Sequence, residues 1–207
     1  TRRFNLTHLA MAGAESVVRP AAAALTELLA LAGAGDPRRR VDSLRAALRN
    51  PDPGAEARFR PFYDWGQLTD IEGFDRDFLE RETDGVRRWL RPADALTVVP
   101  SDVLRPMPVN LNTAPAEVLA GLIGRERADI VRSIEALRER APLRSLAPLA
   151  QRMDPVAFAR LAPWISVHST CFRVTARAAD SRGDRGVMAL VSRELDGRIR
   201  ILEWAEK

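Results

Sequence analysis

The spacing of apolar side chains changes once along this chain, near Pro163, and that change constrains the fold more than any other feature. Upstream, apolar residues recur at helical spacing, and downstream they alternate with polar residues as in half-buried strands. The alternation predicts strands over residues 172–178, 187–191 and 199–201. Asp196-Gly197, a pair favoured in type I′ hairpins, precedes the last of them. A helical body followed by an antiparallel meander is an α+β plan.

Prolines and glycines divide the helical part. Pro20 suits a first turn and predicts the start of one helix. Asp36, as N-cap before Pro37, predicts a second helix that ends before the loop at residues 50–54. Residues 75–90 are predicted to form one helix or two, because their apolar side chains keep a helical spacing.

The clearest helical pattern lies between Asn112 and Pro163. A helix capped by Thr113 and turned by Gly124 precedes a second helix, and shorter helices are expected over residues 145–153 and 155–161. In the second helix one set of side chains is predicted to face inward: Ile130, Val131, Ile134 and Leu137. The set predicted to face outward is Arg127, Arg132, Glu135, Arg138 and Glu139.

The charge balance gives little support to binding of a polyanion. The chain has 32 basic and 28 acidic residues, a formal net charge of +4, and Lys207 is its one lysine. Acidic residues are interspersed with the arginines throughout, whereas binding through phosphate requires positive charge gathered on one face. The high arginine content is therefore interpreted as a compositional bias.

No sequence signature of an enzyme is present. Cys171 is the single cysteine, which excludes an intrachain disulfide and any zinc site built from several thiolates. His8 and His168 are the two imidazoles, and an odd separation on a strand would place His168 and Cys171 on opposite faces. Cys171 is predicted to be a small, partly buried core residue. The chain is expected not to be an enzyme and to have no catalytic residues.

An acidic cluster follows the aromatic segment of the chain. Asp70, Glu72, Asp75 and Asp77 offer the hard oxygen ligands that calcium prefers. The EF-hand spacing is absent, and a solvated, helix-capping cluster explains the same residues. No metal site is predicted there.

The sharpest local motif runs from Val109 to Leu119 and contains Asn110, Asn112, Thr113, Pro115 and Glu117. Asn112 or Thr113 can accept hydrogen bonds from the first turn of the following helix, and Glu117 favours its positive N-terminus. Asn110 can tie the incoming extended segment to this cap. The motif is therefore predicted to be a structural one.

A helix opened in this way, followed by a glycine turn and a second helix, resembles helix-hairpin-helix modules. In those modules, backbone amides of the hairpin grip a phosphate group. The two-glycine turn of that family is reduced here to residues 122–127, where Glu126 would face a phosphate unfavourably. A nucleic-acid-binding module remains the alternative function.

A longer resemblance is to the K-type minor pseudopilins of bacterial type II secretion systems, which share the Asn-x-Asn-Thr-Ala-Pro segment of residues 110–115. The segment 4–9 resembles that family's Phe-Asn-Leu-Asn-x-Leu stretch. Gly54-Ala55-Glu56 with the aromatic residues after it, residues 68–73 and the final Ser169-x-x-Phe172-x-Val174 strand follow in the family's order. The resemblance spans nearly the whole chain.

This resemblance implies a mainly α-helical domain, with helices of SAM-like or helix-hairpin-helix-like type, inserted into a pilin-like fold. Residues 1–19 would be a remnant of the pilin-like part that leads into the insertion. Residues 20–163 would be the helical domain, and residues 164–207 the C-terminal antiparallel strands of the pilin-like domain. Family members assemble with I-type and J-type minor pseudopilins at the pseudopilus tip and support export of folded proteins across the outer membrane.

The resemblance also implies the periplasmic domain of an inner-membrane protein in a Gram-negative bacterium. The apolar run 21–32 is interrupted by Thr26 and Glu27, so no membrane span is predicted. Because the sequence starts at Thr1, an N-terminal anchoring helix is expected to have been removed. No nucleic-acid partner is expected. Family members are associated with calcium, but the region of Asp52 and Glu56 is short and poor in paired carboxylates, so no cofactor is assigned.

Overall fold

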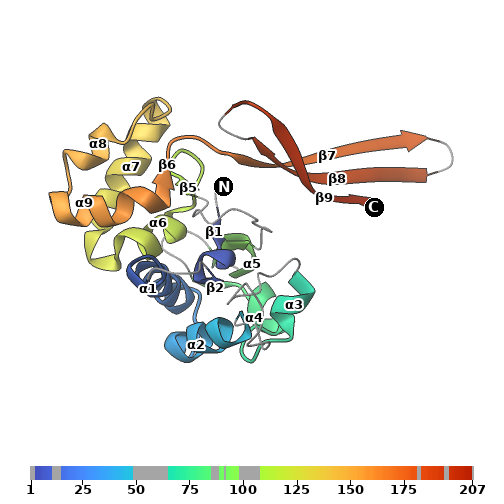
Figure 1. Ribbon diagram of the computed structural model, residues 1–207, viewed down its shortest axis with the longest axis horizontal. Coiled ribbons are helices and arrows are strands. Elements are labelled where there is room, and N and C mark those ends of the chain that lie inside the picture. The colour runs from blue at the N-terminus through green and yellow to red at the C-terminus, as the bar shows by residue number, and fades with distance from the viewer. Residues whose placement is uncertain are drawn as a thin grey trace.

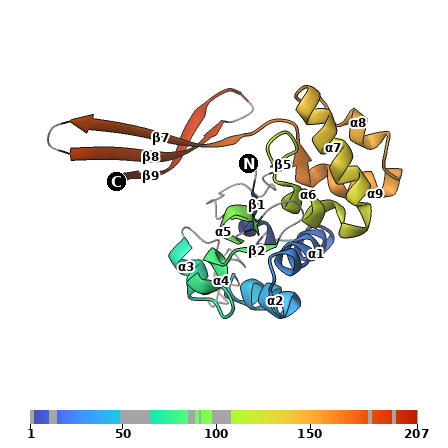
Figure 2. The same cartoon turned by 180° about the vertical axis from the view of Figure 1, so that it is seen from behind.

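The fold joins a body of helices to a C-terminal three-stranded antiparallel sheet, which extends away from the helices (Figure 1). This computed structural model describes residues 3–10, 15–48, 65–84, 89–90, 92–97, 108–180, 183–193 and 196–206. The view from behind shows the same separation of sheet and helices (Figure 2). The predicted α+β class is confirmed.

Nine α-helices, three short 3₁₀ segments and nine strands are found within the described residues. The α-helices are α1 (Glu15–Leu31), α2 (Pro37–Ala47), α3 (Trp65–Thr69), α4 (Arg76–Glu80), α5 (Pro92–Ala95), α6 (Ala116–Ile123), α7 (Ala128–Arg140), α8 (Ala147–Ala150) and α9 (Pro155–Leu161). The 3₁₀ segments are η1 (Leu6–Ala10), η2 (Arg125–Arg127) and η3 (Ala162–Trp164). The strands are β1 (Phe4–Asn5), β2 (Thr83–Asp84), β3 (Trp89–Leu90), β4 (Leu96–Thr97), β5 (Val109–Asn110), β6 (Ile165–Ser166), β7 (Cys171–Asp180), β8 (Gly183–Arg193) and β9 (Ile199–Glu206).

Helix α1 begins at Glu15, upstream of the start predicted at Pro20, so this proline lies inside the helix. A proline there removes one backbone hydrogen bond and costs stability. The burial of Leu25, Leu28 and Leu29 on the same helix offsets that cost. Because α1 is continuous, it runs through the boundary predicted between residues 19 and 20.

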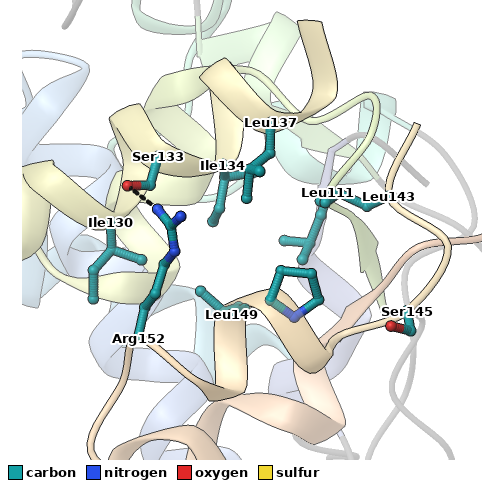
Figure 3. A pocket seen from close by; sticks show the side chains of 10 residues that line it. Leu111, Ile130, Ser133, Ile134, Leu137, Leu143, Ser145, Leu149 and Arg152 are labelled. Carbon is teal, nitrogen blue, oxygen red and sulfur yellow. Dashed lines mark hydrogen bonds between the residues drawn. The ribbon is translucent and has the colours of Figure 1, made fainter. Parts of the chain in front are cut away.

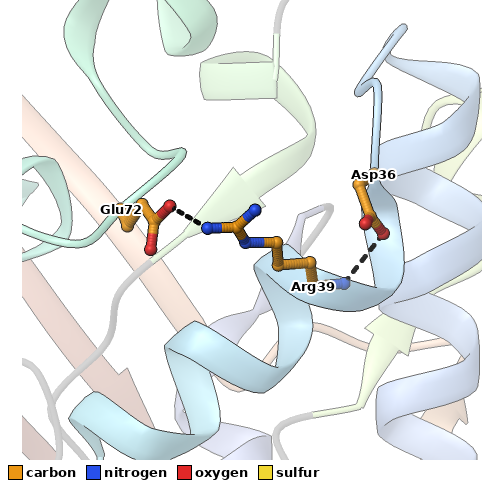
Figure 4. A network of polar contacts seen from close by, with 3 residues as sticks. All are labelled: Asp36, Arg39 and Glu72. Atoms are coloured by element: carbon orange, nitrogen blue, oxygen red, sulfur yellow. Dashed lines mark hydrogen bonds and ion pairs between the residues drawn. The ribbon is translucent and has the colours of Figure 1, made fainter.

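Helix α2 starts as predicted, because the Asp36 carboxylate accepts a hydrogen bond from the Arg39 amide at 3.0 Å. The Arg39 guanidinium reaches the Glu72 carboxylate at 2.6 Å (Figure 4). The neighbouring Arg40 lies over the Phe78 ring, 3.9 Å from its centroid, and burial lowers the pKa of this guanidinium. The arginine run of α2 therefore joins α2 to the segment that carries α4.

The helix predicted over residues 75–90 ends at Glu80. The Asp75 carboxylate caps α4 by accepting from the Phe78 amide at 2.8 Å, and the backbone of Arg81 is already extended. Beyond it, β2 pairs antiparallel with β3, with Asp84 opposite Trp89. The prediction of helix was therefore wrong for residues 83–84 and 89–90, whose backbone groups are paired between strands, and residues 85–88 lie outside the described part of the chain.

One core joins the first residues of the chain to the helices. Phe4, Leu6 and Leu9 are fully buried in the same cluster as the apolar faces of α1 and α6. Helices α1 and α6 approach closely at Gly121, where an added Cβ would lie 3.1 Å from the Leu28 Cβ and 3.2 Å from the Ala24 carbonyl oxygen. Glycine at this position sets the distance between the two helices.

The three-stranded sheet has the order β7-β8-β9. The final hairpin is not a two-residue type I′ turn, since that turn needs positive φ at both central residues. Within the described residues positive φ occurs at glycines alone, and here Gly197 has it and Asp196 does not. Arg193 pairs with Ile199, so the connection is longer than predicted.

Candidate functional site: an asparagine clasp and an apolar sheet face

The segment that carries α6 to α9 begins and ends at two adjacent strands. β5 pairs in parallel with β6, with Val109 opposite Ile165 and Asn110 opposite Ser166. The Leu111 amide then donates to the Ser166 carbonyl at 2.8 Å. The segment that leads into the sheet is thus held directly beside the Asn-x-Asn motif.

Asn112 ties three segments together with its side chain. Its Nδ2 donates to the carbonyls of Leu143 and Val167, at 3.0 Å each. Its Oδ1 accepts from the Leu143 amide at 2.8 Å. One partly buried amide therefore connects the start of α6, the loop after α7 and the segment after β6.

Asn110 completes this arrangement. Its Oδ1 accepts from the Asn112 amide at 2.9 Å, and its Nδ2 donates to the Ser169 hydroxyl at 2.9 Å. We call the side chains of Asn110 and Asn112, with these partners, the asparagine clasp. The clasp fixes the segment after β6 against the helices, two residues before β7 begins.

The motif does not cap α6 with a side chain. The N-cap is Pro115, no side chain bonds the first turn, and Thr113 is exposed. Asn112 is unsuited to capping because its amide is committed to Leu143 and Val167. The prediction of a Thr113 or Asn112 cap was wrong, and sequence gave no sign of these distant partners.

Arg138 and Glu135 face inward, against the prediction that both are outward. Nη1 of Arg138 donates to the carbonyls of Leu111 (2.9 Å) and Ala114 (2.6 Å), and Nη2 lies 3.5 Å from Glu135 Oε1. These carbonyls belong to the segment that leads into α6. Because they need a hydrogen-bond donor, the Arg138 guanidinium points inward. Sequence spacing alone missed Arg138 as a supporting residue of the clasp.

Glu117 lies in the first turn of α6 and is 1% exposed. Neither carboxylate oxygen has a hydrogen-bond partner within the part of the chain that the structure describes. The favourable helix N-terminus acts on this carboxylate, but burial of an ionised group without a partner costs free energy. Within the motif, Glu117 is therefore the residue whose burial costs free energy.

A small cavity lies between α7 and α8, beneath the clasp. It measures about 10 Å³ and is bounded by aliphatic side chains, with Arg152 donating to the Ser133 hydroxyl at 2.7 Å across its side (Figure 3). A space of this size holds one water at most. It is a packing gap and offers no room for a substrate.

The hairpin between α6 and α7 lacks the geometry of a phosphate grip. Gly124 has a φ of +101°, and the Glu126 carboxylate occupies the space where a Cβ of residue 124 would point. A negative charge against the hairpin backbone repels a phosphate group. The arrangement disfavours the helix-hairpin-helix interpretation.

One face of the C-terminal sheet is apolar and exposed. Directly opposed residues of antiparallel strands share a face, which places Phe172, Val191 and Ile201 in one row and Val174, Ala189 and Trp204 in the next. The large exposed side chains of this apolar sheet face are Phe172, Val174, Ile199, Ile201 and Trp204, with Trp204 59% exposed. Exposed apolar patches of this kind mark contact surfaces.

In the strands that were predicted to be half-buried, Phe172, Val174 and Ile201 are exposed, whereas Ala189 of the central strand is buried. The opposite face holds the small cluster of Cys171, Leu190 and Leu202. Leu202 lies between Ile201, which pairs with Val191, and Glu203, which pairs with Leu190, so it sits at the register shift of this strand pair. The sheet projects from the helices, so the body does not cover its apolar side.

The residues considered for chemistry are not brought together. Cys171 is buried, burial raises the pKa of its thiol, and His168 is exposed. His8 is packed between the rings of Phe4 and Trp164, with centroids at 5.4 and 5.1 Å. This places His8 in the core between the first residues and η3.

The acidic cluster is used in structure. Asp75 caps α4 and Glu72 pairs with Arg39. Among the described residues no group of three or more His, Cys, Asp or Glu side chains is placed to hold a metal ion. Asp52 and Glu56, the residues considered for calcium, lie outside the described residues. No helix in the described ranges is long and apolar enough to cross a bilayer.

Comparison with known proteins finds a likeness at the level of structure. No protein-family model and no curated protein sequence matches the chain. A chain in the crystal structure of the GspK-GspI-GspJ complex from the enterotoxigenic Escherichia coli type 2 secretion system matches with a TM-score of 0.72. The match covers 100% of this chain and 76% of that chain at 15% sequence identity. At this identity the likeness is one of fold, and the chain is structurally similar to a component of that complex.

Proposed function

We propose that this chain is part of a K-type minor pseudopilin of a type II secretion system. In this role it assembles with the I-type and J-type minor pseudopilins at the pseudopilus tip and supports export of folded proteins. The observation that carries the proposal is the likeness of fold, over the full length of this chain, to a chain of the GspK-GspI-GspJ complex. The family resemblance of residues 4–9, 110–115 and 169–174 supports the same assignment.

The apolar sheet face gives this proposal a contact surface. Tryptophan is among the residues that contribute most to binding between proteins, and Trp204 is exposed on this face beside the apolar side chains of Phe172 and Ile201. In the proposed assembly this face is covered, whereas in the free chain it meets water. The role is a binding role and requires no catalytic residue.

The asparagine clasp supports the same role by holding the sheet in place. Asn110 bonds Ser169, and the Thr170 carbonyl accepts from the Arg193 amide at 2.7 Å, so the clasp continues into β8. A binding surface on a projecting sheet is useful only when its orientation to the body is fixed. We propose that this is what the Asn-x-Asn motif does.

The domain plan and location follow from the family assignment and are part of the proposal. Residues 20–163 are the inserted helical domain, and residues 164–207 belong with residues 1–19 to a pilin-like domain. This chain is then the periplasmic domain of a protein that an N-terminal helix anchors in the inner membrane. The likeness of α1 to α9 to SAM-like or helix-hairpin-helix-like folds is part of the same expectation.

The test is a reconstitution. The chain is mixed with the soluble domains of the I-type and J-type minor pseudopilins from the same genome, and the mass of the product is measured by size-exclusion chromatography with light scattering. A ternary complex of one copy each is expected. A parallel mixture with short duplex DNA at low salt tests the alternative function. Absence of any complex with the pseudopilins, together with salt-sensitive DNA binding, would overturn the proposal.

A further inference from the structure

The helical body contains an open groove on the side formed by α1, α6 and α9. Its volume is about 200 Å³, and its floor is apolar, formed by Ile123, Met153, Leu161 and Trp164. All four of these side chains are more than nine-tenths buried, so the floor is part of the packed core. The groove is a fixed depression with a shape set by that core.

Two arginines line this groove. Arg127 comes from η2 and is half-buried, while Arg160 comes from α9 and is exposed. Neither guanidinium forms an ion pair or a side-chain hydrogen bond with another residue of the described part of the chain. This sets them apart from Arg39, Arg125 and Arg138, which pair with carboxylates.

The third charged side chain at the groove is Glu126, whose carboxylate lies against Gly124. The groove lining therefore has two positive charges and one negative charge. The Glu126 carboxylate repels any anion, and it repels a phosphate monoester, with its charge of about −1.5 to −2 at pH 7, more strongly than a carboxylate with a single charge. A single carboxylate beside an apolar group fits better, because the apolar part is buried on the floor while the carboxylate reaches the arginines.

The size of the groove indicates the kind of occupant. Pockets for drug-sized molecules typically measure about 300–1,000 Å³. A groove of about 200 Å³ suits one bulky side chain with a few neighbouring atoms. In protein interfaces, anchor side chains fill pockets and are surrounded by contacts that exclude water, so a protein segment can supply such an anchor.

We propose that the α1–α6–α9 groove is a docking site for a protein segment that places one bulky apolar side chain on the groove floor next to a carboxylate. Arg127 and Arg160 bind the carboxylate, and Trp164 lies beneath the apolar side chain. The groove lies on the helices and is separate from the apolar sheet face, so this proposal goes beyond the contact surface proposed for the sheet.

The first experiment selects peptides from a random phage library on the immobilised chain. Clones that also bind an Ala157→Leu variant are discarded, because Ala157 lines the groove and a leucine would fill it. The expected consensus is a large apolar residue adjacent to Asp or Glu. Enrichment of basic peptides, or no enrichment relative to the filled variant, would overturn the proposal.

The second experiment measures the affinity of one synthetic consensus peptide by fluorescence anisotropy. The double variant Arg127→Glu, Arg160→Glu should bind the peptide at least about tenfold more weakly, since an attraction at each position becomes a repulsion. The control is Arg132→Glu, Arg144→Glu, which makes the same charge change at exposed positions outside the groove. Equal weakening by both double variants would mean that net charge alone is responsible, and the site would be rejected.

A replacement variant and a DNA competitor complete the test. If the Ala157→Leu variant fails to fold, as judged by circular dichroism, Arg160→Glu alone replaces it, because its side chain is exposed. Short duplex DNA is added as a competitor at low salt. Displacement of the peptide by DNA would identify a phosphate site and overturn the proposal, whereas persistence of the bound peptide supports it.

Discussion

The side-chain amide of Asn110 donates a hydrogen bond to the Ser169 hydroxyl at 2.9 Å, although the two residues are 59 positions apart. This contact connects β5, the strand that directly precedes α6, to the segment that leads into β7. Together with the three bonds of Asn112, it makes the orientation of the sheet depend on two short amide side chains.

Replacement of Asn112 by alanine should lower the free energy of unfolding by about 2–4 kcal/mol, because it leaves backbone groups of Leu143 and Val167 without their partners. Urea unfolding followed by circular dichroism measures the change. Thr113→Ala is the matched control, since the Thr113 side chain is exposed and makes no hydrogen bond within the described structure. A cost for the control equal to that of Asn112→Ala would show that capping, not the clasp, is responsible.

Arg138→Met should cost about 2–3 kcal/mol of unfolding free energy, because charged hydrogen bonds to two carbonyls and the ion pair with Glu135 are lost. Arg132→Met on the same helix is the control and should change stability by less than about 0.5 kcal/mol, since Arg132 is exposed. Thermal and urea unfolding give both values. A cost of the same size at both positions would refute the assigned contacts.

Glu117→Gln should raise the free energy of unfolding by about 1 kcal/mol, because glutamine keeps the shape of the side chain and removes a charge from a buried place. The same change at Glu139, an exposed residue of α7, should have almost no effect. Unfolding in urea at neutral pH provides the comparison. A clear loss of stability in Glu117→Gln would demonstrate that the carboxylate is paired in the folded protein.

Trp204→Thr should leave the free chain nearly as stable as before, with a change below about 1 kcal/mol, because the side chain is 59% exposed and threonine suits a strand. The proposed complex with the I-type and J-type pseudopilins should weaken by about thirtyfold or more, because the proposal places Trp204 on the contact surface. Titration calorimetry measures the binding. Arg177→Thr, on the opposite face of the sheet, serves as control and should bind normally.

The class of fold could be predicted from sequence because the helical part and the C-terminal part each repeat one period of apolar side chains many times. A repeated apolar spacing predicts a helix correctly even where its first residue is misplaced. In α1, Pro20 was predicted in the first turn and lies inside the helix. The short strands β2 and β3 were missed for the opposite reason. Two residues carry no period, and their pairing depends on a partner that sequence spacing does not identify.

The asparagine motif was found from sequence, but its action was not. Local rules correctly singled out Asn110 and Asn112 as residues that bond the backbone, and then assigned them to the nearest free amides. Their partners at Leu143, Val167 and Ser169 become available only after the chain returns. Glu135 and Arg138 were misplaced similarly, because helical spacing cannot reveal that unpaired carbonyls lie beside an apparently outward face.

The close approach of α1 and α6 at Gly121 imposes a rule on how this sequence can diverge. A side chain at residue 121 is tolerated only if Leu28 becomes smaller or the helices move apart, and movement would open the core beneath them. Residues 28 and 121 are therefore expected to covary among descendants of this chain. A large residue at one position should be accompanied by glycine at the other, so the distance between the two helices would be kept by the combination of these two residues.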